Sequence, residues 1–119
     1  ATAEAKRLLT EHPEINAVIG FNEWATLGVG MAISELDLAD NVCGVGFDSN
    51  IKCVGMLETG EIDTLIVQNP FAIGYLAVSN AAMLMSGKSI EPSIETSVYV
   101  VDRSNMFSKD VQKVLFSFE

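Results

Sequence analysis

Basic residues are scarce in this chain. Only 7 Lys and Arg stand against 16 Asp and Glu, which gives a formal net charge of -9 over 119 residues. Nucleic-acid binding depends on Lys and Arg to neutralise phosphates, and attraction to anionic membrane surfaces depends on them as well. The composition therefore argues against nucleic acid as a partner and against binding to an anionic lipid surface.

Residues suited to metal binding or nucleophilic catalysis are also few. His12 is the single histidine, so no second one exists for a zinc site or a catalytic set. Cys43 and Cys53 cannot form a metal site alone, and we expect both to be free structural thiols. Gly44-Val45-Gly46 lies within a strand pattern rather than at a helix start, which is unlike a dinucleotide fingerprint. The sequence predicts no metal, no cofactor and no enzymatic activity.

Long hydrophobic runs are absent too. About 18 consecutive apolar residues are needed to span a bilayer, and no run reaches that length. The chain is nevertheless 49% hydrophobic, enough for a sizeable core in one domain or a large part of one. Residues 1–10 show a helical pattern from the first position, with no cap and no signal sequence. We therefore expect a piece of a longer protein.

Apolar runs alternate with stretches of helical periodicity. After a first helix that ends near Pro13, the patterns predict strands over 15–21, 42–47, 63–68 and 95–102. The intervening and following helices are expected over 23–36, 49–59, 70–86 and 108–115. Strands that alternate with helices are typical of an α/β fold with a mainly parallel sheet.

Three polar side chains stand at the ends of three successive predicted strands: Asn22, Asp48 and Gln68. In an open α/β sheet, ligands bind just beyond the carboxyl ends of the strands. Two amides and a carboxylate that converge there form a neutral-to-acidic hydrogen-bonding site. Such a site suits a polyhydroxylated small molecule better than a phosphate.

Helix capping is the competing interpretation of these residues. Asn22 could cap the helix over 23–36, and Asp48 could cap the helix that follows it, because both are favoured N-cap types. Ser49 or Asn50 could cap that second helix instead, which leaves Asp48 with two interpretations.

Gln68 has less reason to be a cap. Asn69 followed by Pro70 is a strong helix start, so Gln68 has no local structural duty and its side chain needs another partner. Trp24, the only tryptophan, fits either a packing position or a stacking platform for the face of a sugar. We include it among the candidate ligand-binding residues.

Three segments, in order, match the pattern of a known family. They are Ala17–Glu23 with Leu27-Gly28, Val45–Asp48, and Gly60–Pro70 with Ile73-Gly74. With them the chain resembles the C-terminal part of type I periplasmic sugar-binding proteins of the ribose/galactose-binding class. The resemblance implies part of a parallel-sheet three-layer sandwich, in which Asn22, Asp48 and Gln68 bind sugar hydroxyls.

The resemblance also implies how the chain is divided. Residues 1–69 would form an α/β segment of the C-terminal lobe, and residues 70–95 would supply a helix that packs on a missing N-terminal lobe. Residues 96–119 would supply a returning strand and a C-terminal helix. In this scheme Gln68 borders a hinge strand. Without the other lobe, we expect two copies to associate by exchanging the helix over 70–87.

In function, the resemblance implies the sugar-binding component of an ABC importer, which docks on a membrane permease. Its location would be periplasmic, or extracellular with a lipid anchor. The alternative is the effector-sensing domain of a sugar-responsive repressor, but the approach Gly60–Thr64 to the third strand is more similar to the transport proteins. A phosphoacceptor receiver domain is disfavoured, because Glu23 is the only acid near the first strand end and no Lys follows Gln68.

Overall fold

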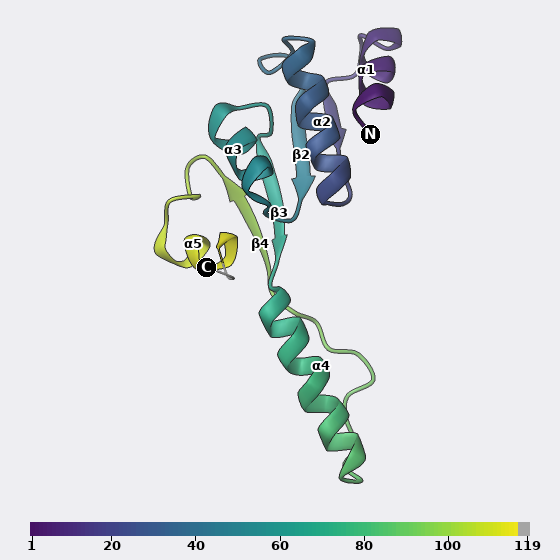
Figure 1. Ribbon diagram of the computed structural model, residues 1–119, viewed down its shortest axis with the longest axis vertical. Helices are drawn as coiled ribbons and strands as arrows, with labels where there is room; N and C mark the ends of the chain where they lie inside the picture. The colour runs from purple at the N-terminus through teal and green to yellow at the C-terminus, as the bar shows by residue number, and fades with distance from the viewer. Residues whose placement is uncertain (117–119) are drawn as a thin grey trace.

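A four-stranded sheet forms the centre of the fold (Figure 1). The computed structural model describes residues 1–116, and the strands lie in the order β1 (Ala17–Ile19), β2 (Cys43–Phe47), β3 (Thr64–Gln68) and β4 (Val98–Asp102). The first three are parallel, and β4 runs antiparallel to β3. The expected α/β class with a mainly parallel sheet is confirmed.

One face of the sheet carries the core. The helices α1 (Thr2–Glu11), α2 (Glu23–Glu35), α3 (Ile51–Thr59) and α5 (Lys109–Leu115) contribute to the same buried cluster as the strands. Leu65 and Val101 pair across β3 and β4, and both are fully buried in that cluster. On β2 the corresponding positions are glycines, which lets α2 lie close to the sheet.

The opposite face of the sheet is apolar but open. Phe47, Ile66 and Val100 lie side by side across β2, β3 and β4. Val100 is 60% exposed and Ile19, on the edge strand β1, is 50% exposed. Of the three layers expected for a complete lobe, residues 1–116 thus supply the sheet and one layer of helices.

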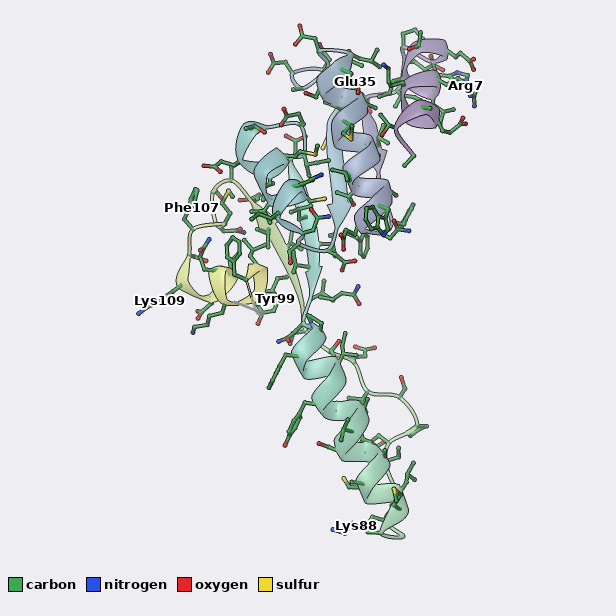
Figure 2. All side chains as sticks on the ribbon, in the orientation of Figure 1. Arg7, Glu35, Lys88, Tyr99, Phe107 and Lys109 are labelled. Atoms are coloured by element: carbon green, nitrogen blue, oxygen red, sulfur yellow. The ribbon has the colours of Figure 1, made fainter. Side chains whose placement is uncertain are left out.

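Helix α4 (Pro70–Met85) stands apart from the sheet. Figures 1 and 2 show it as a rod that projects from the end of β3, with its side chains extending into open space and only the returning segment 86–97 alongside. None of its residues is buried, although the helix is apolar on all sides. An all-round apolar helix is normally covered, but within residues 1–116 only the segment 86–97 lies against this one.

Several expectations can be compared directly with the structure. The sheet strands are shorter than the apolar runs, since β1 covers only 17–19 of the expected 15–21 and β4 only 98–102 of the expected 95–102. Cys43 and Cys53 are both free; Cys53 is buried, as expected of a structural thiol, whereas Cys43 is exposed on β2. No helix within residues 1–116 is long and apolar enough to cross a membrane. Residues 117–119 of the expected unit 96–119 lie outside the described part.

Candidate functional site: a pocket at the strand ends

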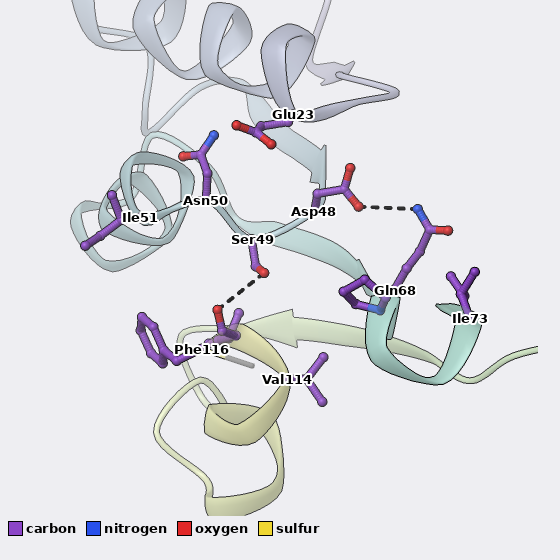
Figure 3. A pocket seen from close by; sticks show the side chains of 11 residues that line it. Glu23, Asp48, Ser49, Asn50, Ile51, Gln68, Ile73, Val114 and Phe116 are labelled. Atoms are coloured by element: carbon purple, nitrogen blue, oxygen red, sulfur yellow. Dashed lines mark hydrogen bonds between the residues drawn. The ribbon is translucent and has the colours of Figure 1, made fainter. Parts of the chain in front are cut away.

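A pocket of about 490 Å³ opens beyond the carboxyl ends of β2 and β3 (Figure 3). We call it the strand-end pocket. Asp48 and Gln68, which directly follow or end these two strands, are both among its lining residues. The other lining residues come from the N-terminal turns of α2, α3 and α4 and from the C-terminal end of α5: Glu23, Ser49, Asn50, Ile51, Pro70, Ile73, Val114, Leu115 and Phe116.

Asp48 and Gln68 interact directly. The side-chain nitrogen Nε2 of Gln68 donates to Oδ1 of Asp48 at 3.3 Å. The backbone N–H of Asp48 donates to the carbonyl of Ile66 at 3.0 Å, which prolongs the ladder between β2 and β3 by one residue. There the chain turns sharply, and Asp48 adopts a positive φ of 66°, a conformation that few residues other than glycine accept. This turn directs the carboxylate into the pocket (Figure 3).

The capping roles fall to the neighbours of these two residues. Asn50 is the N-cap of α3, and its side-chain oxygen accepts from the backbone N–H groups of Lys52 and Cys53, each at 2.9 Å. Asn69 is the N-cap of α4 and accepts from the N–H of Ala72 at 3.0 Å. Asp48 is therefore not the cap of α3, and Gln68 has no capping duty.

Asn22 and Trp24 are placed differently. Asn22 is the N-cap of α2, where its Oδ1 accepts from the N–H of Ala25 at 2.8 Å. This cap uses the amide oxygen and not the amide –NH2 group. Trp24 does not line the strand-end pocket, because it points from the first turn of α2 into solvent and is 73% exposed. The structure thus brings Asp48 and Gln68 together, but neither Asn22 nor Trp24 is among the residues that line the pocket.

Glu23 is a lining residue that the strand-end argument missed. It is the first residue of α2, and it lines the same pocket as Asp48 (Figure 3). Two acidic side chains line the pocket, and none of its lining residues is basic. Burial, followed by the negative charge of Glu23, raises the pKa of the Cys53 thiol. The position of Glu23 directly after Asn22 could have indicated its place.

The apolar wall of the pocket comes from the end of the described chain. Val114 of α5 and the following Phe116 lie on the side of the pocket opposite Glu23 (Figure 3), and Leu115 also lines the pocket. The hydroxyl of Ser49 donates to the carbonyl of Leu115 at 3.4 Å and links this wall to the turn at Asp48. No sequence signal placed α5 here, because its position depends on the antiparallel pairing of β4 with β3.

The pocket therefore combines acceptors and an amide donor on one side with an apolar surface on the other. Sugars match this combination, since their hydroxyls need hydrogen-bond partners and their C–H faces pack on apolar groups. Within residues 1–116, no group of His, Cys, Asp or Glu side chains is arranged to hold a metal ion.

Comparison with known families identifies the class of protein. Residues 1–89 match the model of the periplasmic binding protein domain. The chain belongs to this family, and the match contains the segments that carry Asn22, Asp48 and Gln68.

Individual relatives are sugar-binding proteins by name. The ribose import binding protein of Bacillus subtilis is 29% identical over 89 residues, which are 75% of this chain and 28% of that protein. The corresponding protein of Escherichia coli K12 is 30% identical, over 72% of this chain and 29% of its own length. The chain thus spans less than a third of each of these relatives.

Solved structures agree with this relationship. A carbohydrate transporter solute binding protein of Agrobacterium radiobacter in complex with D-arabinose has a TM-score of 0.90 and 32% identity, covering 96% of this chain and 39% of that one. An ABC transporter solute binding protein of Agrobacterium vitis with bound D-fucose has a TM-score of 0.89 and 25% identity, covering 97% and 40%. The fold described above is therefore that of part of a solute-binding protein.

Proposed function

We propose that this chain forms part of a sugar-binding protein of an ABC importer, and that the strand-end pocket is one wall of its sugar site. The carrying observation is the pair Asp48 and Gln68, which end adjacent parallel strands, are hydrogen-bonded to each other at 3.3 Å and face a pocket with an apolar wall. Membership of the periplasmic binding protein family and the sugars named with its relatives support the proposal. The protein binds its ligand and does not transform it.

Each side chain has a defined part in this proposal. The carboxylate of Asp48 accepts hydrogen bonds from ligand hydroxyls, and the amides of Gln68 and Asn22 donate to ligand oxygens. Charge-assisted hydrogen bonds of the Asp48 type contribute about 1.5–3 kcal/mol each. The cap bond to Ala25 uses the oxygen of Asn22, so its –NH2 group is not used by the cap and can serve this purpose.

The second wall of the site is proposed to be another lobe, which would also cover α4. The relatives are more than twice as long as the matched region, and α4 has no buried residue in the described structure. Two lobes that close on a ligand by a hinge motion at the ends of β3 and β4 would bury both the sugar and this helix. An extracytoplasmic location and docking of the closed form on a membrane permease follow from the same proposal.

The test is sugar binding by the full-length protein. D-ribose, D-arabinose, D-fucose, D-tagatose and D-allose are screened by thermal shift, since a specific ligand stabilises the native state. Asp48→Ala is expected to weaken the best of them about tenfold or more in calorimetry. Asp48→Gly should weaken it equally without the strain of alanine at positive φ. Asp40→Ala removes the same charge from an exposed loop at the opposite end of β2 and should change nothing. Unchanged affinity in Asp48→Ala would refute the assignment.

A further inference from the structure

Thr26 is a fully buried polar residue in the middle of the site's supporting structure. It lies in the first turn of α2, and its side chain is 0% exposed. The backbone N–H of Phe47 donates to its hydroxyl oxygen at 2.8 Å. The hydroxyl proton has its shortest acceptor in the carbonyl of Asn22 at 2.9 Å, with the carbonyls of Gly20 and Phe47 each at 3.3 Å.

Thr26 is in close contact with the backbone at the ends of β1 and β2. A Cβ atom on Gly20 would lie 2.5 Å from the backbone nitrogen of Thr26, and a Cβ on Gly46 would lie 2.1 Å from its methyl carbon Cγ2. Both distances are far below van der Waals contact, so only glycine permits the approach at either position. Glycines that follow β1 and occupy β2 thus form a slot that Thr26 fills.

The two hydrogen bonds of the Thr26 hydroxyl connect the segments that carry two candidate ligand-binding residues. One bond is to Asn22 itself, in the turn after β1. The other is to Phe47, the residue directly before Asp48 in the turn after β2. The N–H of Asp48 is in turn bonded to Ile66 of β3. The backbone before the Asp48 carboxylate is therefore held from α2 on one side and from β3 on the other.

We propose that Thr26 is a positioning residue of the sugar site, whose hydroxyl fixes the turn of Asn22 relative to the turn of Asp48. This inference rests on the proposed function, because it concerns how the same site is held in shape. An apolar side chain could fill the slot, whereas a buried hydroxyl is unfavourable unless it is hydrogen-bonded. The Thr26 hydroxyl accepts from the N–H of Phe47 and donates to the carbonyl of Asn22, and these two residues lead into the turns after β2 and β1.

The structural part of the test needs no sugar. Amide hydrogen exchange of Phe47 and Asp48 is measured by NMR in the full-length protein and in the variants Thr26→Val and Thr26→Ser. Valine has the shape of threonine without the hydroxyl, and serine retains the hydroxyl without the methyl. We expect exchange at Phe47 to accelerate about tenfold in Thr26→Val, because its N–H loses its acceptor, and exchange at Asp48 to accelerate with it, because the turn is then held only from β3. In Thr26→Ser both amides should stay near the original rate. Equal rates in all three proteins would overturn the proposal.

The binding part separates positioning from general loss of stability. Calorimetry with D-ribose, D-arabinose, D-fucose and D-allose should show affinity about tenfold lower in Thr26→Val and nearly unchanged in Thr26→Ser. In an Asp48→Ala background, the further loss caused by Thr26→Val should be much smaller, because the group it positions is gone. Equal losses in serine and valine variants, or full additivity with Asp48→Ala, would contradict the inference.

The experiments also remain informative if the protein binds no tested sugar or if a variant does not fold. If the unaltered protein binds none of the sugars, the proposed function fails while the amide exchange still decides whether Thr26 holds the two turns. If Thr26→Val does not fold, Thr26→Ala takes its place, since alanine removes the hydroxyl and leaves the slot unstrained.

Discussion

Replacing Gly46 with alanine tests whether the close packing of α2 on β2 depends on the missing side chain at this position. The new Cβ would lie 2.1 Å from Cγ2 of Thr26, 2.8 Å from its hydroxyl oxygen and 3.0 Å from Cδ2 of Leu65. Carbon atoms in contact normally lie about 3.5–4.0 Å apart. Thr26 is buried and β-branched, so it has little rotational freedom in the helix. Either α2 moves away from the sheet, or Thr26 rotates and gives up its hydrogen bond to Phe47.

Both responses are costly. Overpacking of this kind destabilises a protein by about 1–3 kcal/mol, and leaving the buried N–H of Phe47 without a partner costs about 1–3 kcal/mol. Whether α2 moves or Thr26 rotates, the cost falls in the same range, so we expect Gly46→Ala to lower the free energy of unfolding by about 2 kcal/mol. The assay is urea denaturation, in which the midpoint should fall while the slope stays constant.

Gly55→Ala is the matched control. Gly55 lies inside α3, and a Cβ there would have no neighbour within 4 Å. The same chemical change should therefore stabilise the protein by about 0.5–1 kcal/mol, because alanine loses less conformational entropy in a helix. Adding Thr26→Ser to Gly46→Ala removes the methyl group that is hit and should recover part of the loss. The reasoning is refuted if the two alanine variants change stability alike, or if the double variant is strictly additive.

Two further predictions concern α4 and the acidic limit of stability. The chain expressed alone should self-associate through the exposed apolar surface of α4. Phe71, Tyr75 and Val78 lie on one side of this helix and are 65–72% exposed, so replacing all three with lysine should give monomers in light scattering. A monomeric unaltered chain would count against this prediction. Hydrogen bonds from the hydroxyl and N–H of Ser104 hold the pKa of Asp102 below its usual value. These hydrogen bonds contribute fully to stability above the unfolded-state pKa of Asp near 4, and the contribution is lost as pH falls through the folded-state pKa of Asp102. The melting temperature should therefore fall less on acidification in Asp102→Asn than in the unaltered protein. Parallel pH profiles of the two proteins would disprove this.

Local sequence chemistry predicted much of this fold. Asn69-Pro70 correctly marked the start of α4 and freed Gln68 from capping. The ambiguity at Asp48 could not be resolved from the sequence, because Asp48, Ser49 and Asn50 are all acceptable caps. Only the geometry shows that Asn50 takes the role and that Asp48 adopts a positive φ.

What the sequence could not predict depends on contacts between distant segments. The wall formed by Val114 to Phe116 exists because β4 pairs antiparallel with β3 and returns α5 to the pocket. Thr26 was not singled out in the sequence, since nothing local indicates that its hydroxyl meets Phe47, 21 positions away. Trp24, a candidate stacking residue, does not line the strand-end pocket, and nothing local in the sequence indicates that its side chain extends into solvent.

The connection between α4 and the sheet has a mechanical consequence. Gln68 pairs with Val98 where the chain leaves β3 and where it returns to β4, so α4 is connected to the sheet at two adjacent points of the backbone. A helix of 16 residues is about 24 Å long and acts as a lever arm. A rotation of about 10° at this connection would carry its far end by about 4 Å, the scale of a hinge movement. Because Gln68 lies where α4 joins the sheet, a small change in its backbone torsion angles would produce a much larger displacement at Met85, the far end of the helix.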